Sequence, residues 1–154
     1  MRPSIDQWAL TLAEIVALRA TCIRRHVGCV LLDNHNHIIA TGYNGRTVGL
    51  PHCQDGIVCV GWEPGVTSGT NLDACEAIHA EQNALLQCGD VHEIHTCYTT
   101  HSPCLTCTKL LLNTSCQRIV FRHPYAHTQA QELWLTARPK DSWINLSLGE
   151  QNEE

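Results

Sequence analysis

Two short motifs constrain this chain more than any other feature of its sequence. One is His79-Ala80-Glu81, and the other is Pro103-Cys104-Leu105-Thr106-Cys107. An imidazole and two thiolates are preferred ligands of Zn²⁺, and three protein ligands leave the fourth tetrahedral position free for water, as in catalytic sites. We therefore expect a fold that brings His79 beside Cys104 and Cys107 around one catalytic zinc.

The residue types also indicate a chemistry. Zinc lowers the pKa of a bound water to about 7, so hydroxide exists at neutral pH. Glu81 is not expected to be a ligand, and it can carry a proton from that water to a ring nitrogen and then to leaving ammonia. The pattern H-x-E…P-C-x-x-C is typical of zinc deaminases. A Cys-x-x-Cys alone is often structural zinc, so the prediction depends on the whole combination and its order.

Local sequence predicts that both motifs open helices. Pro103 suits a first helical turn, because its missing N–H would be unpaired there. Cys104 and Cys107 are three residues apart and would share one helical face, where the helix N-terminus favours thiolates. His79 and Glu81 would diverge in the middle of a helix, so we expect the first catalytic helix to begin at His79 and to span residues 79–88.

Composition and charge exclude several classes of protein. The 154 residues are expected to form a single domain over residues 1–154, with 44% apolar and 16% charged residues. No apolar run approaches the about 18 residues of a membrane span, and the N-terminus does not resemble a signal peptide. Ten cysteines without a secretory signal favour a cytoplasmic location and metal binding over disulfides. A net charge of −5 disfavours a nucleic-acid partner.

The order of the expected elements predicts the fold class. Helices alternate with short apolar strands, which indicates an α/β, three-layer α/β/α sandwich. A hairpin near the start makes the central sheet mixed. The expected helices are 5–20, 79–88, 103–113 and 126–136, and the expected strands are 27–32, 37–42, 93–99, 118–122 and 143–146. Residues 43–74 form a loop too long to be structureless unless something pins it, and residues 150–154 are expected to fray.

Three stretches extend the pattern well beyond the zinc motif. They are Arg19–Gly28, Thr41-Gly42-Tyr43-Asn44-Gly45 and His79–Ala84. With them, residues 8–125 resemble the deoxycytidylate (dCMP) deaminases of the cytidine deaminase superfamily. The resemblance implies hydrolytic deamination of dCMP to dUMP, supplying dTMP synthesis. It also implies a homohexamer that dCTP activates and dTTP inhibits, with Mg²⁺ accompanying the regulatory nucleotide.

Two other functions remain open from the sequence. One is deamination of another substrate, either free cytidine or deoxycytidine or a tRNA adenosine, because these enzymes share the zinc signature. The other is a zinc-stabilised binding module without catalysis, which would not need Glu81.

The resemblance also implies roles for individual residues. Glu81 is the proton shuttle, and Asn44 occupies the place of a polar contact to the substrate. A nucleotide phosphate requires nearby cations, and several flank the matched turns. The expected substrate-binding residues are Asn44, Ala80, His101, Ser102, Pro103, Tyr125, Arg25 and His26. The expected regulatory nucleotide site comprises Gly42, Tyr43, Gly45, Arg46 and Arg24. Which cations serve the substrate and which the regulator stays open.

A second, structural zinc is also expected. Some members of the resembled family carry one, with cysteines at positions similar to Cys22 and Cys53. Cys59 and Cys75 would complete a closed site that pins the long loop, although His52 could replace one thiolate. The other cysteines outside the catalytic motif are expected to be small buried hydrophobes: Cys29, Cys88, Cys97 and Cys116.

Overall fold

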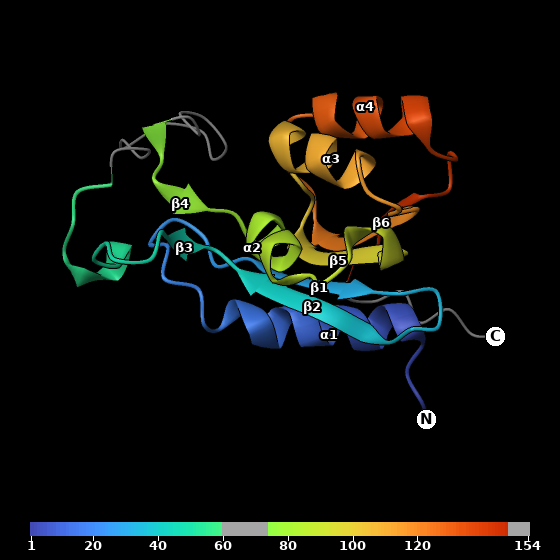
Figure 1. The fold of residues 1–154 in the computed structure, drawn as a ribbon, viewed down its shortest axis with the longest axis horizontal. Coiled ribbons are helices and arrows are strands. Elements are labelled where there is room, and N and C mark those ends of the chain that lie inside the picture. Colours follow the sequence, from blue (N-terminus) through green and yellow to red (C-terminus); the bar gives the residue numbers. More distant parts are fainter. Residues whose placement is uncertain (60–73, 148–154) are drawn as a thin grey trace.

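A computed structural model describes residues 1–59 and 74–147 (Figure 1). The elements in chain order, with η denoting 3₁₀-helices, are α1 (Ile5–Ala17), β1 (Gly28–Leu32), β2 (Ile38–Tyr43), β3 (Gly45–Arg46), η1 (Cys53–Asp55), β4 (Ala77–Ile78), α2 (Ala80–Gln87), η3 (Val91–Glu93), β5 (Thr96–His101), α3 (Leu105–Leu112), β6 (Arg118–His123), α4 (Gln129–Ala137) and β7 (Trp143–Asn145). No helix in these ranges is long and apolar enough to cross a membrane.

The central sheet has five strands in the order β2-β1-β5-β6-β7. Strand β1 pairs antiparallel with both β2 and β5, whereas β5, β6 and β7 run parallel. Helix α1 covers one face of the sheet, and α2, α3 and α4 cover the other (Figure 1). The predicted three-layer sandwich, its mixed sheet and its initial hairpin are confirmed.

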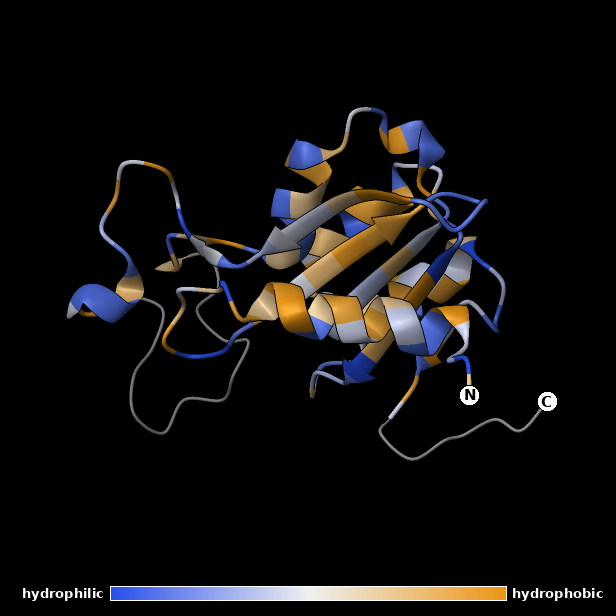
Figure 2. Ribbon diagram, turned by 90° about the horizontal axis from the view of Figure 1, so that it is seen from below, coloured by the Kyte–Doolittle hydropathy of each residue, from blue (hydrophilic) through white to orange (hydrophobic). Residues whose placement is uncertain are grey.

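Apolar residues gather on the sheet and on the helix faces that pack against it (Figure 2). All five residues of β1 are buried, as expected for a strand enclosed by helices on both faces. Two glycines allow the helices to approach closely. A Cβ added at Gly28 would lie 2.0 Å from the Ala13 carbonyl oxygen of α1, and one at Gly42 would lie 2.2 Å from the Ala80 carbonyl oxygen of α2. The sheet therefore sets the position of α2 through Gly42.

Helix α1 begins where the sequence predicts. The Ser4 hydroxyl accepts a hydrogen bond from the Gln7 N–H at 3.2 Å, and the Gln7 side chain accepts one from the Ser4 N–H at 3.1 Å. The helix ends at Ala17, three residues before the expected end. Asp6 in its first turn accepts hydrogen bonds from the Tyr98 hydroxyl at 2.7 Å and from Arg118 at 2.8 Å, which ties α1 to β5 and β6.

Several boundaries differ from the sequence expectations. The strand expected at 93–99 is β5, shifted to Thr96–His101, because Asp90 caps the short helix η3 by accepting from the His92 N–H at 2.8 Å. Pro103 lies outside α3, which begins at Leu105. The long segment contains β3, η1 and the residues before β4, while residues 60–73 and the end expected to fray lie outside the described residues.

Candidate metal centre and active site

The N-termini of α2 and α3 lie close together. His79 is the N-cap residue of α2, and Cys104 is the N-cap residue of α3. The His79 Nδ1 atom lies 3.4 Å from both the Cys104 Sγ and the Cys107 Sγ atoms. A tetrahedral zinc with usual bond lengths separates such nitrogen and sulfur ligands by about 3.6 Å. These three donors therefore fit a zinc ion.

The thiols of Cys104 and Cys107 differ in pKa because they are hydrogen-bonded to each other. Hydrogen bonding with Cys107, helped by His79 and opposed by burial, lowers the pKa of Cys104 to about 4. The Cys104 Sγ atom also accepts the Cys107 N–H at 3.4 Å. Hydrogen bonding to Cys104 and burial raise the pKa of Cys107. This pair can offer one ready thiolate, and a metal cation would favour the second.

Glu81 lies next to the ligands without joining them. It is only 4% exposed in the first turn of α2. Burial raises the pKa of its carboxyl group, although the charge of His79 opposes the shift. Its neighbour in β5 is the Thr99 hydroxyl, 3.5 Å from Glu81 Oε1. A buried carboxyl group with a raised pKa is suited to act as an acid or a base.

A small cavity joins the ligands to Glu81 and to part of the expected substrate site. Its lining residues are Val27, Asn44, His79, Ala80, Glu81, Cys104 and Tyr125. Of the expected substrate-binding residues, the structure thus brings Asn44, Ala80 and Tyr125 directly to the metal centre. Pro103 lines a neighbouring cavity of about 130 Å³, which also contacts Tyr125 and Cys104.

Asn44 and Ser102 hold the walls of this cavity in place. The Asn44 side chain accepts the Val27 N–H and donates to the Arg25 carbonyl oxygen, both at 2.8 Å. The buried Ser102 hydroxyl accepts the Tyr125 N–H at 2.7 Å. As a result, the Arg25 guanidinium lies 4.7 Å from the centroid of the Tyr125 ring. The His101 ring also lies near Tyr125, with 6.5 Å between centroids.

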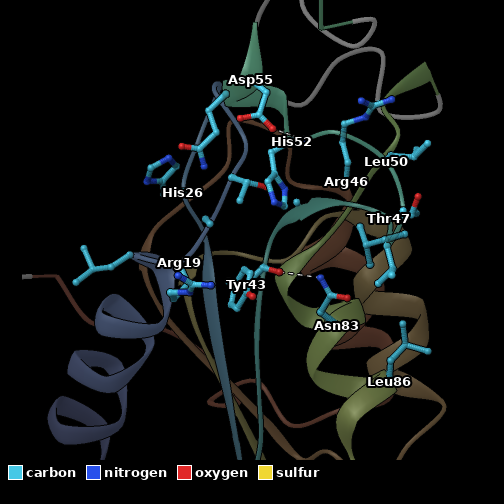
Figure 3. A pocket seen from close by; sticks show the side chains of 18 of the residues that line it. Arg19, His26, Tyr43, Arg46, Thr47, Leu50, His52, Asp55, Asn83 and Leu86 are labelled. Carbon is cyan, nitrogen blue, oxygen red and sulfur yellow. Dashed lines mark hydrogen bonds between the residues drawn. The ribbon is translucent and has the colours of Figure 1, made fainter. Parts of the chain in front are cut away.

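A separate groove of about 1120 Å³ lies between the end of α1, the turn after β2, residues 47–55 and α2 (Figure 3). It contains Tyr43, Gly45 and Arg46 from the expected regulatory site. His26, expected at the substrate, lines this groove. Gly42 and Arg24 are not part of the lining.

The groove also contains residues that sequence reasoning missed. Arg19, His52 and Asn83 line it, and the Asn83 amide donates to the Tyr43 carbonyl oxygen at 2.7 Å (Figure 3). The sequence could have indicated Asn83, because this residue belongs to the His79–Ala84 stretch. Arg19 likewise begins the Arg19–Gly28 stretch, and His52 was expected only as an alternative ligand of the second zinc.

The four cysteines expected to bind a second zinc are neighbours. Cys53, Cys59 and Cys75 line a small cavity beside β4. Burial raises the pKa of Cys53, and the nearby thiols of Cys22, Cys59 and Cys75 raise it further. Within residues 1–59 and 74–147, however, the only three His, Cys or carboxylate donors that lie within 4.8 Å of one another are His79, Cys104 and Cys107.

The remaining cysteines mostly pack as expected. Cys29, Cys97 and Cys116 are fully buried. Cys88, at the end of α2, is only half-buried. None of these thiols lines the cavity at the metal centre.

Comparisons with known proteins agree with this geometry. The family described as "Cytidine and deoxycytidylate deaminase zinc-binding region" matches residues 3–123. Deoxycytidylate deaminases of Saccharomyces cerevisiae and Schizosaccharomyces pombe are 39% and 37% identical over 127 and 126 residues, which are 81% and 80% of this chain. The chain spans 39% and 38% of the length of these two yeast relatives.

A shorter relative and a solved structure cover the chain more evenly. The deoxycytidylate deaminase of Mycobacterium phage D29 is 35% identical over 126 residues, which are 78% of this chain and 95% of that protein. The dCMP deaminase of cyanophage S-TIM5, solved in complex with dCMP and dUMP, shares the fold with a TM-score of 0.71 and 24% identity, covering 96% of this chain and 99% of that one. This chain belongs to the cytidine and deoxycytidylate deaminase family.

Proposed function

We propose that this protein is a zinc-dependent dCMP deaminase that hydrolyses dCMP to dUMP, a step that supplies dTMP synthesis. The proposal depends most on the set of three mutually close donors, His79, Cys104 and Cys107, two of which share a cavity with the buried Glu81. Relatives named deoxycytidylate deaminase support the substrate, including the phage protein that this chain nearly spans. Zinc bound there would supply an ionised water at neutral pH.

The protein's own groups account for the rest of the reaction. Glu81 takes a proton from the attacking water at a carboxyl oxygen and delivers it to the ring nitrogen of cytosine as the new C–O bond forms at the amino-bearing carbon. It then moves a second proton from the new hydroxyl group to the amino group, which leaves as ammonia when the C–N bond breaks. Burial raises the pKa of this carboxyl group, which favours its protonated form between the two transfers. Tyr125 and Asn44 form the walls that orient the base and sugar, and Arg25 beside Tyr125 offers a positive charge to the substrate phosphate.

The substrate is tested by following loss of cytosine absorbance with dCMP, CMP and deoxycytidine. We expect rapid turnover of dCMP and much slower turnover of deoxycytidine, because deoxycytidine lacks the phosphate that Arg25 would bind. Preference for the nucleoside would contradict the phosphate assignment. Zinc-loaded protein that turns over none of the three would point to another substrate or to a binding module.

Regulation by dCTP and dTTP, with Mg²⁺, is proposed for the groove shown in Figure 3. Arg19 and Arg46 supply positive charge, and His26 and His52 supply imidazole groups, along a space large enough for a nucleoside triphosphate. The groove shares α2 with the metal centre, so a ligand there can move His79 and Glu81. We expect dTTP to inhibit and dCTP to activate, and Arg19→Gln to raise the inhibition constant for dTTP. Kinetics insensitive to both nucleotides would contradict this assignment.

A second zinc on Cys22, Cys53, Cys59 and Cys75 and a homohexamer complete the proposal. The mutual proximity of the four thiols supports the metal site, because a cation would relieve the repulsion between thiolates. Metal analysis should find two zinc ions per chain, and Cys75→Ser should remove only one. A single zinc in the wild-type protein would contradict the second site. Light scattering that detects only monomers would contradict the hexamer.

A further inference from the structure

Thr99 places a hydroxyl group inside the hydrophobic core, directly behind the proposed active site. It lies in β5, pairs with Cys29 of β1 and is fully buried. Cys29 and Cys97, on the same face of the sheet, belong to the core cluster that packs against α2. A valine of the same shape would fill this position without burying a hydroxyl, which costs free energy unless it is hydrogen-bonded. Packing alone therefore does not account for the hydroxyl.

The Thr99 hydroxyl lies between two acceptors. Its Oγ1 atom is 2.9 Å from the His101 carbonyl oxygen and 3.5 Å from Glu81 Oε1. A hydroxyl has one proton to donate and lone pairs that accept, and it rotates between its partners. The longer contact is typical of a catalytic hydrogen bond before the substrate is bound, because such bonds tighten in the complex. Thr99 can therefore donate to the Glu81 carboxyl group or accept from it.

Zinc binding would leave Thr99 as the main hydrogen-bonding side chain at this carboxyl group. The structure gives the Glu81 carboxyl group two further hydrogen bonds, with the Cys107 thiol and with the backbone N–H of Glu81 itself. A zinc ion takes the Cys107 sulfur as a ligand and displaces its proton, so the thiol can no longer donate. Of these three groups, the Thr99 hydroxyl is then the one side chain that can still donate a hydrogen bond to Glu81.

We propose that Thr99 is a positioning residue whose hydroxyl orients the Glu81 carboxyl group in both of its protonation states. This inference rests on the proposed function, in which Glu81 carries the proton. The hydroxyl donates to Glu81 when the carboxyl group is ionised. When Glu81 holds the proton taken from water, the carboxyl group donates to Thr99 Oγ1, and the hydroxyl donates to the His101 carbonyl oxygen. Thr99 itself neither gains nor loses a proton.

Steady-state kinetics of the zinc-loaded full chain with dCMP test this role. Thr99→Val keeps the shape of the side chain and removes the hydroxyl. It should lower kcat about tenfold, as expected for loss of one hydrogen bond to a charged group. KM should stay close to the wild-type value, because Thr99 contacts Glu81 and not the substrate. Wild-type kcat in Thr99→Val would overturn the inference and leave the proposed function intact.

Thr99→Ser separates the hydroxyl from the packing of the side chain. This variant keeps the hydroxyl and loses only the methyl group, so it should restore most of the wild-type kcat. Equal losses of kcat in Thr99→Ser and Thr99→Val would assign the effect to packing and overturn the inference. Zinc per chain should equal that of the wild type in both variants. A loss of zinc that parallels the loss of kcat would place the effect at the metal and would also overturn it.

Thr108→Val is the matched control. Thr108 is also fully buried, it follows Cys107 in α3, and its hydroxyl has no hydrogen-bond partner within the described ranges of the chain. Removing this hydroxyl should therefore leave kcat unchanged. A loss of kcat in Thr108→Val as large as that in Thr99→Val would show that the hydroxyl of Thr99 has no special role.

Crystal structures of the zinc-loaded wild type and Thr99→Val decide the case even if dCMP is not a substrate. In the wild type, we expect the Glu81 carboxyl group in a single position within hydrogen-bonding distance of Thr99 Oγ1. In Thr99→Val, the carboxyl group should be displaced or divided between two positions. An identical position in both proteins would overturn the inference independently of any activity. The expected displacement in a protein that does not turn over dCMP would support the role of Thr99 and contradict only the proposed substrate.

Discussion

Gly42 sets the distance between the sheet and the helix that carries His79 and Glu81. In Gly42→Ala, the new Cβ would lie 2.2 Å from the Ala80 carbonyl oxygen and 2.3 Å from the Ala84 nitrogen. Real Cβ contacts are at least 3.0 Å, so the shortfall is 0.8 Å against backbone atoms that have no rotamer to change. The start of α2 must therefore move away from β2 by about this distance.

The displacement exceeds what the metal centre tolerates. Metal–ligand distances are held within about 0.2 Å, so moving His79 relative to Cys104 and Cys107 weakens the site. A misplacement of about 1 Å can lower the rate by about 10²-fold. Overpacking itself costs about 1–3 kcal/mol, which for a domain of this size lowers Tm by roughly 2–12 °C. We expect Gly42→Ala to fold, bind zinc more weakly and lose about 99% of kcat/KM.

Gly28→Ala is the matched control for this experiment. Its Cβ would lie 2.0 Å from the Ala13 carbonyl oxygen, so it displaces α1 on the opposite face of the sheet. Zinc competition with a chromophoric chelator, thermal unfolding and dCMP kinetics should be measured on both variants. Both should lose stability, but only Gly42→Ala should lose zinc affinity. Wild-type zinc affinity in Gly42→Ala, or equal loss in both variants, would show that Gly42 does not set the position of the zinc ligand on α2.

Three further predictions concern stability. Because burial raises the pKa of Glu81, its charge destabilises the fold above the unfolded pKa of about 4.3. Metal-free Glu81→Gln should therefore resist urea better than the wild type near pH 7, with the difference vanishing as the pH falls to 4. Tyr98→Phe removes the hydrogen bond to Asp6 and should cost about 1 kcal/mol, or about 2–4 °C in Tm, with unchanged zinc content. The pKa of His101 falls from about 6.5 in the unfolded chain to about 4 in the fold. The free energy of unfolding therefore decreases as the pH drops through this window, because the unfolded chain takes up the proton first. In urea titrations, His101→Gln should lose less stability than the wild type between about pH 7.5 and 5.

Features with a local physical cause were predictable from the sequence. Ser4 and Gln7 form the capping box that begins α1, and the turn residues between β1 and β2 produce the expected hairpin. The divergence of His79 and Glu81 within a helix correctly required α2 to begin at the motif. The same motif with Cys104 and Cys107 predicted the metal donors, because zinc chemistry restricts the residue types and their order.

Features that depend on strand register, or on the direction in which a side chain points, were not predictable from the sequence. The pairing of His101 with His123 requires the relative shift of β5 and β6, and a shift of one residue would turn the side chains to the other face. The sequence also could not separate Arg25, which lies over Tyr125, from its neighbour His26, which lines the groove.

The boundary at Pro103 shows how a side-chain contact can override a propensity. The sequence favours Pro103 in the first helical turn, but the Cys104 sulfur accepts the Cys107 N–H and so takes the N-cap position. The proline is thereby placed before the helix.

The most direct test of the central claim compares the wild type with Glu81→Gln, both loaded with zinc. Zinc per chain and turnover of dCMP should be measured on the same samples. Both proteins should hold equal zinc at His79, Cys104 and Cys107, and turnover should fall by at least about 10²-fold in the variant. Undiminished dCMP turnover by zinc-loaded Glu81→Gln would contradict the assignment of Glu81, and with it the proposed mechanism.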